Sequence, residues 1–331
     1  MAMPIYCESE STAPRASNGR GVLGSSSHTP TGPTRNCQTQ GTREPSAVAY
    51  ARRRCVKRGG VAMGPNETER RRWNDPYWSG VWPRREQLTG AVTPLLLEHL
   101  QLMPGERVLD IGSGAGITSI AASALVGTTG EVVGADISAP LVAFSTRRAA
   151  NENAMNVRFV VADVQEDEVP GAPFDVALSQ FGVMFFDSPP TAFRNIRGHL
   201  RQGGRLGFAC WQVAENNKWH LSRALGPFLP PAPPPTPGTS ATGPFSLGDP
   251  ARTKALLGDA GFQDIEHTAF DLVADVGPDA IVDEDQLVFL GVTEDRLPEA
   301  REAVAAHLAQ FARPDGRYDA PLAVQIFIAS T

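Results

Sequence analysis

A glycine-rich turn dictates the architecture of this chain more than any other segment. It reads Val108-Leu109-Asp110-Ile111-Gly112-Ser113-Gly114-Ala115-Gly116, between a strand-like apolar run and an apolar helix pattern at residues 117–126. Glycines let the backbone turn sharply and approach a ligand closely, and the free amides of a helix N-terminus favour negative charge. The Gly-x-Gly-x-Gly spacing, with Asp110 two residues before it, differs from the Gly-x-Gly-x-x-Gly of dinucleotide sites. The turn predicts an α/β fold with a ligand at this strand end.

Two acidic residues follow at the ends of the next two predicted strands. Asp136 ends the strand 131–136, and Asp163 follows the strand 157–161. A carboxylate about 20 residues beyond the glycines can accept both hydroxyls of a ribose, and Ile137 beside it can press on an adenine face. The alternative is that Asp136 only caps the next helix. Because Asp163 stands at the end of the next strand, the presence of both acids favours ligand binding over helix capping.

Strand and helix patterns alternate along the rest of the chain, which predicts a parallel sheet with helices on both faces. Helices are expected at 95–102, 117–126, 139–153 and 249–260, and across most of 287–311. Strands are expected at 107–111, 131–136, 157–161, 174–179 and 205–210, within 262–276, and at 322–329.

The composition divides the chain into parts. Residues 63–104 are interpreted as a helical cap with a cluster of aromatic residues, and 105–226 as a cofactor-binding core. A proline-rich loop at 227–248 follows, as either a rigid spacer or a lid over a substrate site, because a polyproline run fits neither a helix nor a central strand. Residues 249–331 are expected to complete the sheet and to supply helices on the substrate side.

The first 62 residues are interpreted as a disordered basic tail. They hold nine Arg or Lys against three Glu and show almost no apolar periodicity, so they cannot offset the entropy of ordering. Arg52-Arg53-Arg54 matches a nuclear or nucleic-acid signal by pattern alone. We hypothesise instead that translation begins at Met63. The remaining 269 residues then carry a net charge of −12, which argues against a nucleic-acid partner.

The cysteines and the hydropathy bear on metals and location. Cys7, Cys37 and Cys55 lie in the tail and Cys210 in a predicted core strand, so no close pair predicts a metal site or a disulfide framework. No run of 18 apolar residues and no leader sequence is found. A cytoplasmic protein with no membrane partner and no metal is expected.

The segment from Thr68 to Thr331 resembles the class I S-adenosylmethionine-dependent methyltransferases, in their bacterial small-molecule branch. Besides the glycine turn and the two acids, the similar motifs are Ser179-Gln180-Phe181-Gly182-Val183-Met184-Phe185-Phe186, Gly203-Gly204-Arg205-Leu206, Gly243-Pro244-Phe245 and Ala260-Gly261-Phe262. The resemblance implies a Rossmann-like, doubly wound, seven-stranded sheet, mostly parallel with an antiparallel last strand, preceded by the helical cap.

The resemblance also implies S-adenosylmethionine as the cofactor and S-adenosylhomocysteine as its product. The glycine turn would hold the methionine end, and Asp163 would accept from the adenine amino group. The implied cofactor-binding residues are Asp110, Gly112, Ser113, Gly114, Gly116, Asp136, Ile137, Asp163, Val164, Ser179 and Phe181. Gln180 departs from the pattern, since relatives often carry Arg there, and this puts the substrate class in doubt.

The methyl group of a sulfonium is already activated, so catalysis would mainly hold a nucleophile in line with it. His220, after the fifth predicted strand, is the candidate general base, with packing as its alternative. The candidate substrate-binding residues are Tyr77, Trp82, Gln180, Phe185, Asp187, Trp211, Glu215 and Trp219. Core or cap packing explains the aromatic ones equally well.

An acidic stretch bears on the acceptor. Residues 249–319 hold sixteen acids against six bases, a surface that would attract a cationic small molecule or simply keep helix faces solvated. The chain resembles gentamicin-type aminoglycoside N-methyltransferases, which implies methylation of an amino-sugar amine in antibiotic biosynthesis. The alternatives are O- or C-methylation of a polyketide, quinone or phenol, which predicts an apolar pocket, and a cofactor-binding regulatory module without catalysis.

Overall fold

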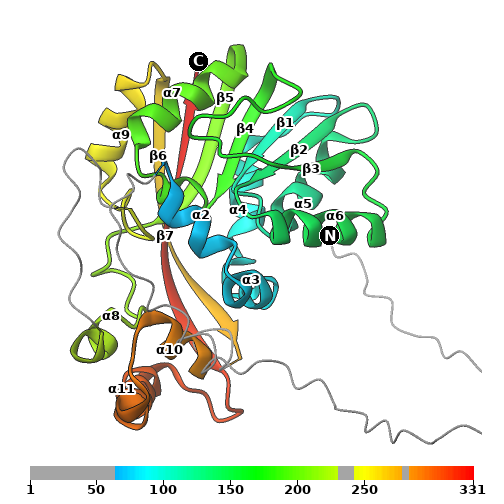
Figure 1. Ribbon diagram of the computed structural model, residues 1–331. Helices are drawn as coiled ribbons and strands as arrows, with labels where there is room; N and C mark the ends of the chain where they lie inside the picture. The colour runs from blue at the N-terminus through cyan, green and yellow to red at the C-terminus, as the bar shows by residue number, and fades with distance from the viewer. Residues whose placement is uncertain (1–63, 230–241, 278–282) are drawn as a thin grey trace, which may run out of the picture. The chain divides into compact units, whose positions relative to one another are not determined.

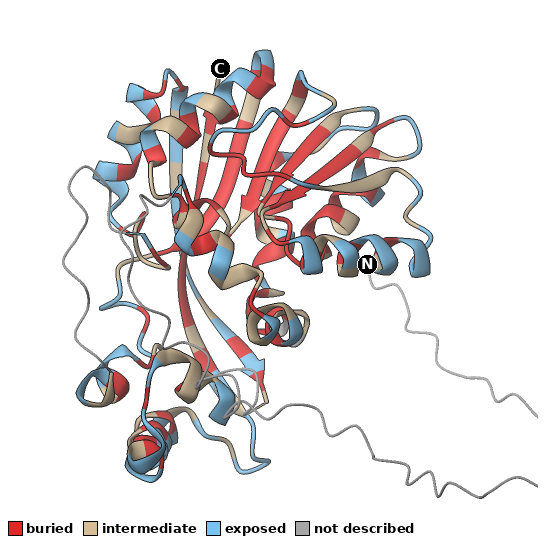
Figure 2. Ribbon diagram, in the orientation of Figure 1, coloured by how far each residue is buried: buried red, intermediate tan, exposed pale blue. Residues whose placement is uncertain are grey.

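The apolar runs of the sequence form the centre of one seven-stranded sheet with the order β3-β2-β1-β4-β5-β7-β6 (Figure 1). Its strands are β1 Arg107–Ile111, β2 Glu131–Asp136, β3 Val157–Val161, β4 Phe174–Gln180, β5 Leu200–Trp211, β6 Gln263–Val276 and β7 Tyr318–Ser330. The first five strands are parallel, and β7 runs antiparallel to both β5 and β6. The central strands are buried on both faces, which explains their continuous apolar runs (Figure 2).

This computed structural model describes residues 64–229, 242–277 and 283–331, all within one compact unit. The predicted basic tail and most of the proline-rich loop therefore lie outside the described residues. In the described part of the chain, no helix combines the length and the apolar character needed to cross a bilayer.

Helices pack on both faces of the sheet. The longer ones are α2 Glu67–Trp73, α3 Pro76–Thr89, α4 Val92–Leu100, α5 Ile117–Val126, α6 Ala139–Asn151, α7 Pro189–His199, α9 Pro250–Asp259, α10 Glu284–Leu290 and α11 Leu297–Leu308. Short helical turns are η2 Val183–Phe185, α8 Ser222–Leu225, η3 Gly226–Phe228, η5 Glu294–Arg296 and η6 Ala309–Phe311. Helices α4, α5 and α6 cover one face, and α7 and α9 cover the other (Figure 1).

The predicted fold class is confirmed, with four strands of the parallel half matching their expected positions to within one residue. Sequence reasoning missed α7, which begins at Pro189-Pro190, where a proline at the first helical position is favourable because its missing N–H has no helical partner. It also began β5 five residues too late. The stretch around Gly203 carries few apolar residues, and the pairing of β4 with β5 shifts register there.

The antiparallel pair β6–β7 is longer than the rest of the sheet. Its pairing continues from Ala323 to Tyr318, beyond the last β5 pair at Trp211 and Val324. Helices α8, α10 and α11 gather at this extended end (Figure 1). The extended β6–β7 pair therefore places α8, α10 and α11 away from the parallel strands of the sheet.

Candidate functional site

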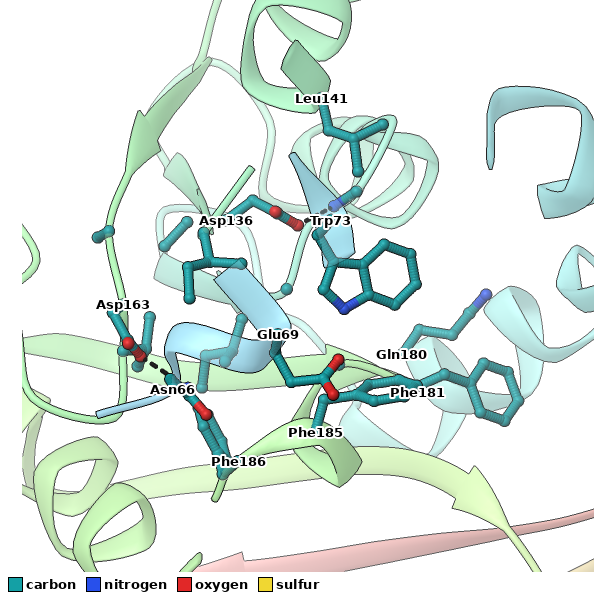
Figure 3. A pocket seen from close by; sticks show the side chains of 18 of the residues that line it. Asn66, Glu69, Trp73, Asp136, Leu141, Asp163, Gln180, Phe181, Phe185 and Phe186 are labelled. Carbon is teal, nitrogen blue, oxygen red and sulfur yellow. Dashed lines mark hydrogen bonds between the residues drawn. The ribbon is translucent and has the colours of Figure 1, made fainter. Parts of the chain in front are cut away.

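A cavity opens at the carboxyl ends of the parallel strands, beneath helices α2 and α3 (Figure 3). This is the edge where open α/β sheets bind ligands. It is lined by Asn66, Glu69, Trp73, Trp82, Ile111, Gly112, Gly114, Ala135, Asp136, Ile137, Leu141, Ala162, Asp163, Val164, Gln180, Phe181, Gly182, Phe185 and Phe186.

The glycine turn after β1 forms the floor of the cavity. Gly112 has φ +67°, and a Cβ there would lie 2.8 Å from the Cα of Gly182 in the turn after β4. Gly114 has φ +54°, and a Cβ would lie 2.7 Å from Nε1 of Trp82. Only glycine allows both the left-handed backbone and these approaches. The sequence therefore needs glycine here so that two strand ends and the cap can meet.

Asp136 joins the glycine turn to the start of α6. One carboxylate oxygen accepts from Gly114 N at 2.8 Å, and the other accepts from Ser138 N at 2.8 Å. The side-chain cap of α6 is Ser138 itself. Burial raises the pKa of Asp136, although the two backbone bonds oppose the shift. Because each carboxylate oxygen has two acceptor positions, one position on each remains for a ligand hydroxyl.

Asp163, after β3, is held by the cap. Its Oδ1 accepts from Nδ2 of Asn66 at 3.0 Å and from Gln165 N at 3.1 Å, and Arg70 lies 3.4 Å from its Oδ2. Burial raises the pKa of Asp163, against the lowering effect of these contacts. Asn66 also exchanges two bonds with Asp187, so the predicted adenine site and the loop after β4 are tied to the same cap residue.

Asp110 lies behind the cavity rather than in its wall. It is 1% exposed, and its carboxylate accepts from the Ser119 hydroxyl at 2.5 Å. Burial raises the pKa of Asp110 to about 7; the Ser119 bond opposes this, and the charges of Asp136 and Glu86 add to it. Gly116 and Ser113 also lie outside the lining, and a Cβ at Gly116 would meet Phe159 and Ser145.

The turn after β4 forms another part of the cavity wall. The Ser179 hydroxyl donates to Ile111 O at 2.7 Å and fixes the ends of β1 and β4 together. Phe181 follows with φ +62°, a conformation rare outside glycine, and stacks on Trp211 at a centroid distance of 4.3 Å. Gln180 accepts from Thr93 Oγ1 at 2.9 Å. A strained, buried residue is therefore maintained at the cavity wall.

The cap contributes an aromatic and acidic wall. Trp73 contacts Trp82 edge-on at a centroid distance of 5.1 Å and Phe185 at 5.4 Å. Glu86 accepts from Ala115 N at 3.1 Å and pairs with Arg148 at 2.8 Å, so it binds an amide of the glycine turn. Burial raises the pKa of Glu86, and Arg148 opposes this shift.

Several predicted substrate residues do not line the cavity. Tyr77 donates to Asp283 before α10 at 3.0 Å, and burial raises its pKa. Glu215 is exposed, and Trp219 packs on Trp211 at 5.2 Å, behind Phe181. Of the predicted substrate set, Trp82, Gln180 and Phe185 do line it.

His220 lies near α8, where its Nδ1 accepts from Ser222 N at 3.3 Å and its ring contacts Phe245 edge-on at 4.8 Å. It is not a lining residue. Burial lowers the pKa of His220, and the charge of His307 lowers it further. Its role as a general base stays a prediction.

Sequence reasoning missed Asn66, Glu69, Trp73, Leu141 and Phe186 as lining residues. The aromatic cluster of the cap pointed toward Trp73. No local pattern marks Glu69, which precedes three arginines in a helix that looks solvent-exposed.

Part of the chain matches a known protein family and several known proteins. Residues 108–204 match the family model described as a methyltransferase domain. Over 111 residues the chain is 38% identical to the ubiquinone/menaquinone biosynthesis C-methyltransferase UbiE of Ectopseudomonas mendocina, covering 33% of this chain and 43% of that protein. Over 113 residues it is 30% identical to the aklanonic acid methyltransferase DauC of a Streptomyces species, covering 34% and 51%. The matched region thus spans about half the length of these curated relatives.

Among solved structures, the YcgJ protein of Bacillus subtilis aligns with a TM-score of 0.51 and 18% identity, over 73% of this chain and 98% of that one. This likeness concerns the fold. Together with the strand order, it confirms the Rossmann-like seven-stranded fold that the sequence predicted. Neither UbiE nor DauC is named as an aminoglycoside enzyme.

Proposed function

We propose that this chain transfers a methyl group from S-adenosylmethionine to a carbon or oxygen atom of a largely apolar small molecule. The observation that carries the proposal is a single cavity with two unlike ends. One end holds the glycine turn and the carboxylates of Asp136 and Asp163, and the other is walled by aromatic side chains of the cap and of the turn after β4.

The polar end fits the cofactor. The bends at Gly112 and Gly114 bring the backbone to the cavity floor, where it would hold the methionine part. Asp136 keeps one acceptor position on each oxygen for ribose hydroxyls, and Ile137 and Val164 would flank the adenine. Asp163 would accept a hydrogen bond from the adenine amino group after its hydrogen bond from Asn66 breaks. Asp110 would act through the glycine turn, since it lies behind it.

The apolar end supports the acceptor class. Trp73, Phe181 and Phe185 line it, as expected of a pocket for a polyketide, quinone or phenol. When bound, S-adenosylmethionine supplies an activated methyl group on a sulfonium. The aromatic wall would exclude water and hold the acceptor in line with that methyl group, so positioning would supply most of the rate enhancement. The two matched relatives, a C-methyltransferase and an aklanonic acid methyltransferase, support this class.

An amine acceptor, such as an amino sugar of an aminoglycoside, is the second candidate, since acidic residues dominate 249–319. In the structure, Asp275 pairs with Arg313 and Arg317, and Glu284 pairs with Arg301. No acid of this stretch that the structure describes lines the cavity. These contacts support a solvated surface more than a binding site for a cation.

Methyl-labelled S-adenosylmethionine tests the proposal. Calorimetry would first measure binding of S-adenosylhomocysteine to the full chain. The chain would then be incubated with the labelled cofactor in separate reactions with phenols, quinones, polyketide aglycones and aminoglycosides. We expect heat of binding, and label in an apolar acceptor at carbon or oxygen. Label in aminoglycosides alone would reject the acceptor class, and absence of cofactor binding would reject the function.

A further inference from the structure

Glu69 is a buried acid that no local sequence pattern marks. It lies in α2, is 3% exposed, and lines the cavity together with Trp73 and Phe181. Figure 3 shows its carboxylate directed into the cavity, near Phe185 and away from Asp163. Glu69 therefore lies at the aromatic end, where the proposed acceptor would bind.

One oxygen of this carboxylate lacks a hydrogen bond. Oε2 is buried, and no donor within hydrogen-bond geometry satisfies it among the described residues. Arg72, one helical turn along, forms an ion pair with it at 3.4 Å, and the Arg72 side chain is 37% exposed. A buried carboxylate oxygen without a donor is destabilising, so its position in a cavity wall points to a ligand that donates to it.

Burial raises the pKa of Glu69. The charge of Arg72 and a hydrogen bond from Trp73 oppose this shift, and the charge of Asp187 adds to it. A carboxylate with a raised pKa is a stronger base than a solvated one, which suits it to accept a proton during a reaction.

We propose that Glu69 is the group that accepts the proton of the methyl acceptor, with its Oε2, which lacks a hydrogen-bond donor, receiving the O–H or acidic C–H hydrogen in the bound complex. This rests on the proposed methyl transfer. The acceptor's bond to hydrogen breaks and its bond to the methyl carbon forms. The methyl–sulfur bond breaks with its electron pair left on sulfur, and the proton passes to Glu69 and then to solvent.

The nucleoside sinefungin tests this without knowledge of the acceptor. It carries an amine-bearing carbon in place of the methylated sulfur, so it presents an N–H donor where the methyl group would be, whereas S-adenosylhomocysteine presents a neutral thioether. Calorimetry would measure both ligands on the wild type and on Glu69→Gln. We expect sinefungin to bind the wild type more tightly than S-adenosylhomocysteine. In Glu69→Gln, sinefungin affinity should fall by roughly ten-fold or more, while that of S-adenosylhomocysteine changes by less than about two-fold.

Glu67→Gln is the matched control. Glu67 belongs to the same helix but pairs with Arg71 at 2.7 Å and does not line the cavity, so both affinities should stay unchanged. If Glu69→Gln fails to fold, Glu69→Asp keeps the charge and withdraws it by one methylene, and the preference for sinefungin should shrink. An equal change for both ligands, or none, would overturn the role of Glu69. Failure of both ligands to bind the wild type would instead reject the proposed function itself, and the role of Glu69 with it.

Discussion

The two walls of the cavity are held in place in different ways. The strand-end wall consists of turns that directly follow β1, β2 and β3, and its groups bond to neighbouring turns, as Asp136 does with Gly114 and Ser138. The cap wall consists of α2 and α3, which reach the cavity through a few side chains, such as Asn66 on Asp163 and Glu86 on Ala115.

This difference determines how each wall responds to change. Backbone at the ends of a buried sheet cannot move without disturbing the core. We therefore expect the strand-end wall to open only when the whole fold unfolds. The cap wall depends on individual polar contacts worth about 0.5–1.5 kcal/mol each, and it can open while the sheet stays folded. We therefore expect substitutions in the first wall to lower overall stability or affinity, and those in the second to alter local opening.

Asp110, which lies in β1 directly behind the strand-end wall, gives the largest expected effect. Its pKa rises to about 7, mainly through burial, so the folded state holds a proton that the unfolded state releases near pH 4. Stability then falls as pH rises from about 4 to about 7. Asp110→Asn removes this loss, and its free energy of unfolding relative to wild type should rise by roughly 3 kcal/mol between pH 5 and pH 8.

Urea denaturation at each pH measures this difference, with Asp175→Asn as the control. Burial raises the pKa of Asp175, but Arg107 and Arg201 outweigh it and lower the pKa, so its titration lies below the range tested. The relative stability of that variant should be constant from pH 5 to pH 8. If the relative stability of Asp110→Asn is also constant over this pH range, burial of Asp110 does not destabilise the folded protein at high pH.

Gly112 tests whether that wall tolerates any displacement. An alanine Cβ would lie 2.8 Å from the backbone of Gly182, at a residue with φ +67°. We expect Gly112→Ala to lower the free energy of unfolding by about 2–3 kcal/mol. Gly316→Ala is the control, because φ is +79° there and no atom lies within 4 Å of the added Cβ. If both variants lose equally, backbone strain alone explains the effect and the contact between the two turns carries none.

The two walls also differ in how far the sequence predicts them. The glycine turn, Asp136 and Asp163 follow strands recognisable by their apolar runs, and parallel strands bring their carboxyl ends to one edge. Their shared cavity therefore follows from local patterns. The long β6–β7 ribbon was located only in outline, because β6 is an edge strand with alternating exposure and carries polar residues along its length.

The cap could not be derived in the same way. Asn66 meets Asp163 across 97 positions of sequence, and such a contact leaves no periodic signal. Tyr77 was expected near the ligand, but its hydroxyl is used in a contact with Asp283 and Arg85, which joins α3 to the start of α10. Glu69 looked like one charge among many in a polar helix, and only the packing of α2 on the strand ends buries it.

Asp136 connects the strand-end wall to the proposed cofactor. Asp136→Asn leaves one oxygen to serve Gly114 N and Ser138 N, so a bond to the turn or to a ribose hydroxyl is lost. We expect the affinity for S-adenosylhomocysteine, measured by calorimetry, to fall about 30-fold, or about 2 kcal/mol. Asp249→Asn, at the start of α9 outside the cavity, should leave affinity unchanged because Asn also caps helices well. Unchanged affinity in Asp136→Asn would remove this residue from the cofactor site.

Asn66 gives the smallest effect and addresses the cap directly. It is 4% exposed, has φ +54°, and its side chain bonds to Asp163 and to the backbone of Asp187. Asn66→Gly keeps the left-handed backbone and removes only these side-chain bonds. Amide hydrogen exchange in α2 should become roughly tenfold faster, corresponding to about 1.4 kcal/mol of local opening, while β1 and β4 remain protected.

Asn153→Gly is the matched control for this change, since Asn153 also has a positive φ, of +57°, but is exposed at the end of α6. It should leave exchange in α2 unaltered. Equal acceleration in α2 and in the central strands of Asn66→Gly would contradict the distinction between the walls, because the cap would then open only when the whole sheet unfolds. Faster exchange confined to α2 would mean that the cap can open as a unit above a rigid floor, which gives a bulky cofactor a way in without loss of the strand-end geometry.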